Sequence, residues 1–320
     1  MRKKKLAFVF SGAAARIAQQ AVMMRYLVQG KAFKDGKTLV PTVLAGASSG
    51  AISIVALNAI LLTEGLVEGG ELKERFSWSD YEQIIGSINR KDVYNAGGVL
   101  RSALEFVGDG AIFDTTPLRE LLEETLEKRI GFHTLGDLPV RSYISVVEQE
   151  TGKIHRLSSV DHPDLPLVDV VMASAAIPIL FPPVELMLPG KSDTAACVDG
   201  GTGIDMIPVD AIHRDRYDRV ILIRPQPYDP EKKWFKDPPF SDVRIVKHTI
   251  NNFMFIEEAL MDYAFHRAVW HDGGRVYCYV PDLECNHSPL DFESGREQLQ
   301  KTEEWAGSDQ NRPKLVKNCI

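Results

Sequence analysis

The sequence predicts an α/β fold with a mostly parallel central sheet, and three observations point to it. Short apolar runs rich in β-branched and aromatic residues alternate with longer helix-like stretches. Turns of glycine and other small residues close several of these runs, as at Gly46–Gly50. No internal repeat or break in composition divides residues 1–320, so we expect a single domain.

The N-terminal part supplies two strand–helix units. Residues 6–10 form an apolar run, which a loop of small residues joins to a helix-like stretch at 17–28. Residues 42–46 predict a second buried strand, followed by an apolar helix at 51–62. Free N–H groups in a loop between strand and helix can bind an anion or an oxyanion.

The first residues imitate a secretory signal peptide, with a basic start, an apolar run and Ala13–Ala15 as a cleavage-like site. The apolar run spans only residues 6–10, and Arg16 follows the supposed site at once. A first strand is therefore the better interpretation. No stretch of about 20 apolar residues that could cross a bilayer occurs. We expect a cytoplasmic protein.

The middle of the chain is polar and irregular at residues 64–110, which predicts either a helical cap over a site or a peripheral helical region. A clear helix then begins with Thr116 as N-cap and Pro117 at the first position. Further predicted elements are a hairpin at 141–148 and 154–157, a helix at 168–176, an extended run at 177–184, strands at 219–224 and 275–280, helices at 242–270 and 294–305, and a loose polar tail at 306–320.

Composition excludes several classes of protein. The formal net charge of −7 argues against a general nucleic-acid binder, because no domain-scale basic face is available for phosphates. The four cysteines form no Cys-x-x-Cys pair, so neither a disulfide framework nor a zinc site is expected. Glycine fingerprints of dinucleotide and nucleotide phosphate sites are absent. We expect no cofactor and no metal ion.

One short patch could contact a membrane. Trp234 and Phe235 stand among three lysines in a proline-rich loop, and tips of aromatic and basic residues can lie in a bilayer interface. Because the patch is so short, we favour a solvated loop with a buried aromatic residue. Peripheral membrane contact remains the alternative.

The second strand ends in Gly46-Ala47-Ser48-Ser49-Gly50, a Gly-x-Ser-x-Gly pattern. Such a pattern between a strand and a helix predicts a nucleophile elbow, in which the serine hydroxyl is exposed beside a helix N-terminus. The turn is crowded, so the residues two before and two after the serine must be small. An ordinary tight strand-to-helix turn would have the same pattern.

Two further strand ends carry small-residue turns, Gly12–Arg16 and Asp199–Gly201. In open parallel sheets, strand ends gather along one edge, where sites form. A serine, a carboxylate and several backbone N–H groups could therefore converge. For Asp199 the commoner role of an aspartate before Gly-Gly is to cap a turn.

These motifs together resemble those of the patatin-like phospholipases of the bacterial type. That family has, in order, a glycine-rich oxyanion loop, the serine elbow, a Ser-Ala-Ala-x-Pro stretch running into Phe-x-Pro, and an Asp-Gly-Gly turn. Here the last three are intact at Gly46–Gly50, at Ser174–Pro178 with Phe181–Pro183, and at Asp199–Gly201. The four motifs place a motif-bearing core at residues 6–208.

The resemblance implies a three-layer α/β/α fold and a lipid acyl hydrolase of the phospholipase A or lysophospholipase kind. It implies Ser48 as the nucleophile and Asp199 as its base, with an acyl-enzyme on Ser48 that water hydrolyses. Gly46, Gly50, Gly200 and Gly201 would support the turns. The implied partner is a lipid or another acyl ester.

The first loop departs from the family pattern. The family's three glycines are Gly12-Ala13-Ala14 here, Arg16 matches the family arginine that would support the loop, and Ile17 replaces the following glycine. Main-chain N–H groups of this loop and of Ser49 would form the oxyanion hole. Alanine can serve where φ is negative, but it costs about 1 kcal/mol or more where φ must be positive.

Three alternatives stay open. A Ser–His–Asp esterase would need one of the histidines that follow Asp199, none of which lies in a distinctive motif. An acyltransferase would pass the acyl group to an acceptor other than water. A weakly active or non-catalytic lipid-binding relative would explain the altered oxyanion loop. The candidate histidines are His213, His248, His266, His271 and His287.

Overall fold

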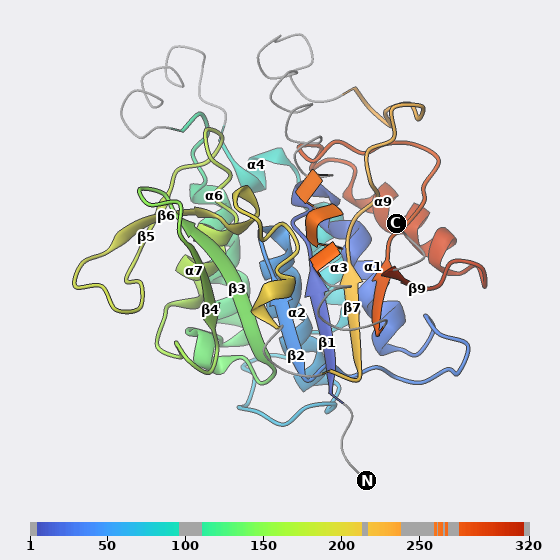
Figure 1. The fold of residues 1–320 in the computed structure, drawn as a ribbon, viewed down its shortest axis with the longest axis horizontal. Helices are drawn as coiled ribbons and strands as arrows, with labels where there is room; N and C mark the ends of the chain where they lie inside the picture. The colour runs from blue at the N-terminus through green and yellow to red at the C-terminus, as the bar shows by residue number, and fades with distance from the viewer. Residues whose placement is uncertain are drawn as a thin grey trace.

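The computed structural model describes residues 5–95, 111–212, 217–237, 259–260, 262–264, 266–267 and 275–316. Within these residues nine strands form one sheet, in which β4 pairs with β3 and the other strands follow the order β5-β6-β3-β2-β1-β7-β8-β9 (Figure 1). The strands are β1 (Leu6–Phe10), β2 (Val43–Gly46), β3 (Arg141–Glu148), β4 (Ile154–Ser158), β5 (Val184–Leu186), β6 (Ala195–Asp199), β7 (Arg219–Ile223), β8 (Val276–Tyr279) and β9 (Lys314–Leu315).

The centre of the sheet is parallel and its flanks are antiparallel. Strands β3, β2, β1, β7 and β8 run in the same direction, whereas β4 and β6 pair antiparallel with β3 and β9 pairs antiparallel with β8. The predicted mostly parallel sheet and the predicted hairpin of β3 and β4 are both confirmed. Carboxyl ends of the parallel strands therefore share one edge, where sites form in such sheets.

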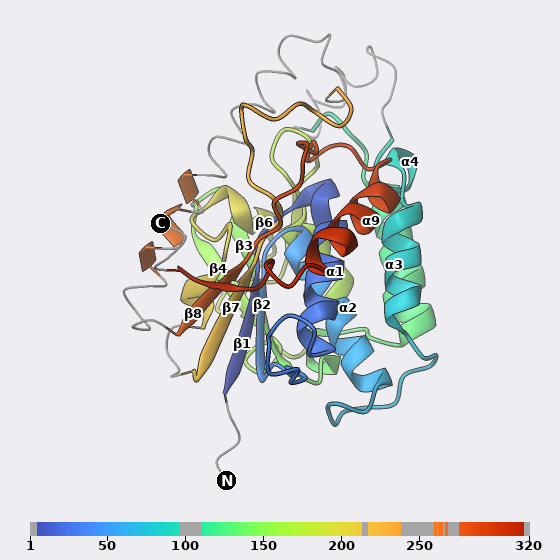
Figure 2. The same ribbon diagram turned by 90° about the vertical axis from the view of Figure 1, so that its right-hand side faces the viewer.

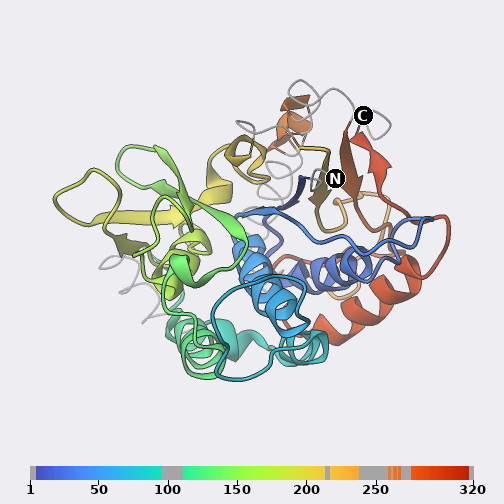
Figure 3. The same ribbon diagram turned by 90° about the horizontal axis from the view of Figure 1, so that it is seen from below.

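The helices are α1 (Ile17–Val28), α2 (Ser49–Thr63), α3 (Trp78–Ser87), α4 (Arg90–Val93), α6 (Thr116–Leu122), α7 (Leu167–Ser174) and α9 (Gly295–Ala306). Helix α6 continues as a π-helical stretch, Glu123–Ile130. Figures 2 and 3 show α1, α2, α3 and α9 on one side of the strands. Among the described residues, none forms a helix with the length and apolar character needed to cross a bilayer.

Both faces of the sheet are covered, which confirms three layers. Alternate residues of β1 point to opposite faces: Phe8 and Phe10 belong to an apolar cluster that includes residues of α1, α2 and α7. Ala7 and Val9 belong to a second cluster, which includes Met206, Ile207, Val209, Ile212, Tyr217 and Ala264. Helix α2 is apolar around its whole circumference because it is buried between the sheet and the outer helices. Helix α3 is in the outer layer and begins with a capping box.

Some sequence expectations need correction. The N-cap of α6 is Thr115 instead of Thr116. The run at 177–184 is not extended in its first half: the N–H groups of Leu180 and Phe181 donate to Ile177 O at 3.1 and 2.8 Å, which closes a turn. Of the helix predicted at 242–270, most residues lie outside the described part.

The tail from 306 was expected to be loose, but β9 pairs with β8 and Val316 is buried in the sheet's second apolar cluster. A short apolar segment in a polar tail is enough to add an edge strand when a partner edge is free. The region 64–95 contains α3 and α4, while 96–110 lies outside the described residues.

Candidate active site

Ser48 stands between β2 and α2 in a strained backbone conformation. Its φ of 55° and ψ of −131° lie where non-glycine residues are rarely found. A Cβ on Gly46 would lie 2.5 Å from Gly50 O, and one on Gly50 would lie 2.7 Å from Ser11 O. Neither position therefore accepts a side chain, as a nucleophile elbow requires.

A second serine holds the elbow in place. The N–H of Ser48 donates to Ser174 Oγ at 3.0 Å, and that hydroxyl donates to Ser145 O at 2.8 Å. All three residues are buried. Ser174 begins the Ser-Ala-Ala-x-Pro stretch, so this contact links that motif directly to the elbow. The contact with Ser145 has no local sequence signal.

Strand pairing brings Asp199 to the elbow. Tyr143–Val147 pair with β4 along one edge of β3, so β2 and β6 share the other edge. On that edge Gly46 is opposite Ile144, and Asp199 is opposite Val146. Strand β6 therefore ends just beyond the carboxyl end of β2, where the chain turns to Ser48.

Asp199 is only 3% exposed and accepts two hydrogen bonds. One comes from Gly201 N–H at 2.7 Å, and the other comes from the Ser48 side chain. Burial away from water raises the pKa of Asp199 to about 7, although both hydrogen bonds act in the opposite direction. The carboxyl group can therefore accept and release a proton near neutral pH.

The segment after Asp199 is fixed by contacts that the sequence did not reveal. A Cβ on Gly200 would lie 2.3 Å from Ser145 O, so this position has to be glycine. Asp205 accepts a hydrogen bond from Ser145 Oγ at 2.8 Å and pairs with Arg156 at 2.7 and 2.8 Å. Ser145 thus touches both the elbow support and the Asp199 turn.

The first loop has few free N–H groups. Gly12 N–H donates to Met206 O at 2.9 Å, and Ala13 N–H donates to Ser49 Oγ at 2.8 Å. No acceptor for the Ala14 N–H is found among the described residues. Ser49 is the first residue of α2, where N–H groups lack intrahelical acceptors. Within the described residues, the N–H groups of Ala14 and Ser49 are therefore the candidate donors to an anion beside Ser48.

Backbone conformation separates the two alanines of this loop. Ala13 has a φ of −146°, which alanine adopts freely, but Ala14 has a φ of 46°. A Cβ on Gly12 would lie 2.8 Å from Met206 Sδ and 3.3 Å from Ser48 Cβ, so a side chain there would displace Met206. From the sequence we expected a cost wherever alanine needs a positive φ, and the structure locates it at Ala14. The contact of Met206 with this loop was not predicted.

Arg16 is 2% exposed, which excludes a surface arginine. Its guanidinium donates to Gln226 O at 3.1 Å and so ties the loop to the segment after β7. A small cavity with an empty volume of about 230 Å³ joins these groups; it is lined by Gly12, Ala13, Ala14, Arg16, Ser48, Asp199 and Met206.

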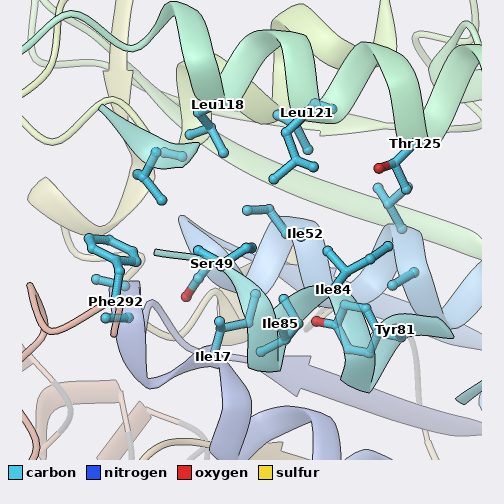
Figure 4. A pocket seen from close by; sticks show the side chains of 18 of the residues that line it. Ile17, Ser49, Ile52, Tyr81, Ile84, Ile85, Leu118, Leu121, Thr125 and Phe292 are labelled. Atoms are coloured by element: carbon cyan, nitrogen blue, oxygen red, sulfur yellow. The ribbon is translucent and has the colours of Figure 1, made fainter. Parts of the chain in front are cut away.

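An apolar cavity begins at Ser48 and Ser49 and runs along α2. Its empty volume is about 1060 Å³, open space at its mouth included. Figure 4 shows Ile52 of α2 between residues of α3, such as Ile84 and Tyr81, and residues of α6, such as Leu118 and Leu121. Almost the whole lining is aliphatic or aromatic, so the cavity fits a hydrocarbon chain.

The candidate histidines do not complete a triad in the described residues. His266 is exposed, and His287 is buried against Phe235 and Cys285. Burial lowers the pKa of His287 to about 4. His213, His248 and His271 lie outside the described residues. The Ser48 side chain donates a hydrogen bond directly to the Asp199 carboxyl group, with no histidine between them.

The aromatic patch packs against the protein. The Trp234 ring stacks on Tyr228 at 5.4 Å, and Phe235 contacts the His287 ring at 5.1 Å. Both aromatic residues are half-buried, which favours the solvated-loop interpretation. In the described part of the chain no three His, Cys, Asp or Glu side chains are grouped to hold a metal ion.

The family model described as patatin-like phospholipase matches residues 8–213. No curated protein matches the chain. Among solved structures, VipD from Legionella pneumophila is 15% identical, with a TM-score of 0.40, covering 97% of this chain and 67% of VipD. The type III effector protein ExoU is 11% identical, with a TM-score of 0.38 and coverage of 97% and 52%. The chain thus spans about half the length of the ExoU chain.

Proposed function

The chain belongs to the patatin-like phospholipase family, and from this premise we propose that it hydrolyses carboxylic esters of lipids, as a phospholipase A or lysophospholipase does. The observation that carries the proposal is the buried Asp199 carboxyl group, hydrogen-bonded to Ser48, which in turn lines an apolar cavity. Ser48 as the proposed nucleophile, Asp199 as the proposed base and the apolar cavity as the proposed acyl site are therefore adjacent.

In the proposed mechanism Ser48 and Asp199 act as a dyad. Asp199 takes the hydroxyl proton as Ser48 Oγ bonds to the ester carbonyl carbon. The ester C–O bond then breaks, and the proton passes to the leaving alcohol. Water attacks the acyl-enzyme, again giving its proton to Asp199, and the carboxylic acid leaves as Ser48 regains its proton. A pKa near 7 suits both proton transfers.

The carbonyl oxygen becomes negatively charged in each step and needs N–H donors. We assign this role to the N–H groups of Ala14 and Ser49. Ala13 N–H can join them when the Ser49 hydroxyl turns away from it. The N-terminus of α2 adds favourable electrostatic potential at the same place.

The acyl chain would lie along α2, with α3 and the helix that begins with α6 as its outer walls. These walls come partly from residues 64–110, so we propose that the described part of this region is a helical cap over the acyl site. Burying one methylene group there is worth about 0.8 kcal/mol. Long-chain esters should therefore be preferred over short ones.

A second candidate is a lipid-binding protein with weak turnover. Two observations favour it: Ala13 N–H donates to the Ser49 hydroxyl, and the backbone of Ala14 is strained. Losing one oxyanion donor can lower the rate by about 100- to 1000-fold. Acyl transfer to an acceptor other than water would use the same acyl-enzyme.

Labelling with a fluorophosphonate probe tests the proposal. We expect covalent labelling at Ser48, hydrolysis of p-nitrophenyl esters, and loss of both in Ser48→Ala. The exposed Ser192→Ala serves as the matched control and should retain both. His266→Ala and His287→Ala should keep turnover within a few fold. Labelling elsewhere, or unchanged turnover in Ser48→Ala, would show that the mechanism is wrong, whereas labelling without turnover would favour the lipid-binding candidate.

A further inference from the structure

The oxyanion loop at 12–16 is held by residues near the C-terminus. Ala15 N–H donates to Pro289 O at 2.9 Å, and Ala15 O accepts from Gln298 Nε2 at 3.2 Å. Both main-chain polar groups of Ala15 are therefore engaged by the same segment of chain. We refer to Pro289 and Gln298 as the C-terminal brace. Both lie beyond residues 8–213, which the family model matches.

The Gln298 side chain is itself fixed in orientation. It is fully buried on α9, which lies along α1 (Figure 2). Its Nε2 also donates to Ser294 Oγ at 2.9 Å, and its Oε1 accepts from Gln19 Nε2 at 3.1 Å. Gln19 Oε1 in turn accepts from Gln226 N–H at 2.8 Å. If the Gln298 amide were flipped, its Oε1 would face the acceptor Ala15 O and its Nε2 would face the donor Gln19 Nε2. The N–H₂ group of Gln298 therefore stays directed at Ala15 O.

Next to Ala15, the backbone of Ala14 is strained at a φ of 46°. L-residues seldom adopt this left-handed conformation, whereas glycine does so without a steric cost. Such a conformation persists only where surrounding contacts enforce it. The hydrogen bonds to Ala15 are contacts of this kind, because they fix the peptide groups that follow Ala14.

We propose that Gln298 is a positioning residue that keeps Ala14 in its left-handed conformation and so keeps the Ala14 N–H available to the small cavity beside Ser48. The inference rests on the proposed function for its effect on turnover. It explains how alanine can stand where the family has glycine: the strain is offset by a brace from outside the matched region.

A double-mutant cycle between Gln298→Ala and Ala14→Gly tests this coupling. In the wild-type background we expect Gln298→Ala to lower kcat for a p-nitrophenyl ester by about 10- to 100-fold with little change in KM, because a misplacement of about 1 Å can cost about 100-fold. In the Ala14→Gly background the same change should cost less than about threefold, because glycine needs no brace to hold a positive φ.

The matched control is Gln300→Ala on the exposed side of α9, which should leave kcat unchanged. Equal losses in both backgrounds would show that Gln298 acts on folding in general, and no loss in either would show that it does not act on the loop. Either result overturns the proposal. If Gln298→Ala fails to fold, Gln298→Met retains the volume without the donor and replaces it in the cycle.

Amide hydrogen exchange separates this inference from the proposed function. Exchange at residues 12–16 should quicken in Gln298→Ala, while exchange in α2 stays as in the wild type. If the wild type neither hydrolyses esters nor is labelled at Ser48, the proposed function fails, and faster exchange still supports the brace. Unchanged exchange at Ala15 contradicts the brace whatever the turnover.

Discussion

In the proposed mechanism the Asp199 carboxyl group has to be buried and also act as a base. This group is enclosed beside Ser48, and burial raises its pKa to about 7. Raising the pKa makes the carboxylate a stronger base for the serine proton, but it also means that the folded chain holds a charge with little water around it at alkaline pH. The raised pKa therefore favours the proposed proton transfer and lowers the stability of the folded chain at alkaline pH.

We expect kcat to rise with pH and to level off above about pH 7, because only the deprotonated Asp199 can accept the Ser48 proton. Below that pH the rate should fall by about tenfold per unit. The measurement is the pH dependence of ester hydrolysis over pH 4–9. A rate that stays level down to pH 5 would contradict Asp199 as the base.

Asp199→Asn should nearly abolish turnover and change the pH dependence of stability. The folded pKa of about 7 exceeds the ordinary value of 3.8, so wild-type stability is lost as pH rises between these values. The variant lacks this loss. Its unfolding free energy relative to the wild type should therefore increase by roughly 1.4 kcal/mol per pH unit from pH 4 to 7 and then level off. Urea unfolding at several pH values measures it, and a constant difference would contradict the raised pKa.

Residues of α3 and α6 line the apolar cavity together with residues of α2, so in the proposed function these helices determine which acyl chains fit. Their cavity-facing residues recur at helical spacing, as at Tyr81, Ile84 and Ile85 on α3. The polar residues of α3 face outward, and the capping box at Ser77 and Asp80 fixes where the helix begins.

Ile84→Phe should shift the preference toward short acyl chains. The larger ring fills space beside Ile52, and overpacking costs about 1–3 kcal/mol, so kcat/KM for a dodecanoate ester should fall about tenfold relative to a butyrate ester. Gln83→Phe, on the exposed side of the same helix, is the control. Equal effects of the two variants on both esters would place the acyl chain elsewhere.

At the scale of the whole molecule, the sheet is completed by segments from both ends of the chain. Strand β1 lies between β2 and β7, and the last described residues add β9 and the buried Val316 to the far edge. Ser48 follows the carboxyl end of β2, and strands β1, β7 and β8 separate β2 from β9 at that edge.

A chain that ends at Pro313 should lose about 2 kcal/mol or more of unfolding free energy, because it exposes the apolar surface that Val316 covers and removes an edge strand. Its turnover at low temperature should remain close to wild type. A chain that ends at Val316 is the control for shortening alone. Equal stability of the two truncated chains, measured by urea unfolding, would contradict a structural role for β9.

The sequence predicted what local patterns encode. Gly46–Gly50 and Asp199–Gly201 are turns whose shape demands particular residue types, so their motifs could be read directly. The brace could not be predicted in this way. Gln298 and Pro289 act through hydrogen bonds to Ala15 across more than 270 positions, and a buried glutamine on a helix has no pattern of its own. Ser145 and Asp205 could not be predicted either, because they too act through contacts between residues far apart in the sequence.

The distance along the chain between Ser48 and Gln298 has a consequence for protein synthesis. The ribosome adds about 5–20 residues per second, so roughly 10–50 s separate the emergence of Ser48 from that of Gln298, the residue proposed to hold the loop at 12–16. Strand β7, which completes the neighbourhood of β1, also emerges long after Ser48. A nascent chain therefore carries Ser48 without the brace until Gln298 has been synthesised, and we expect the loop at Ala14 to be held in its left-handed conformation only from that point on.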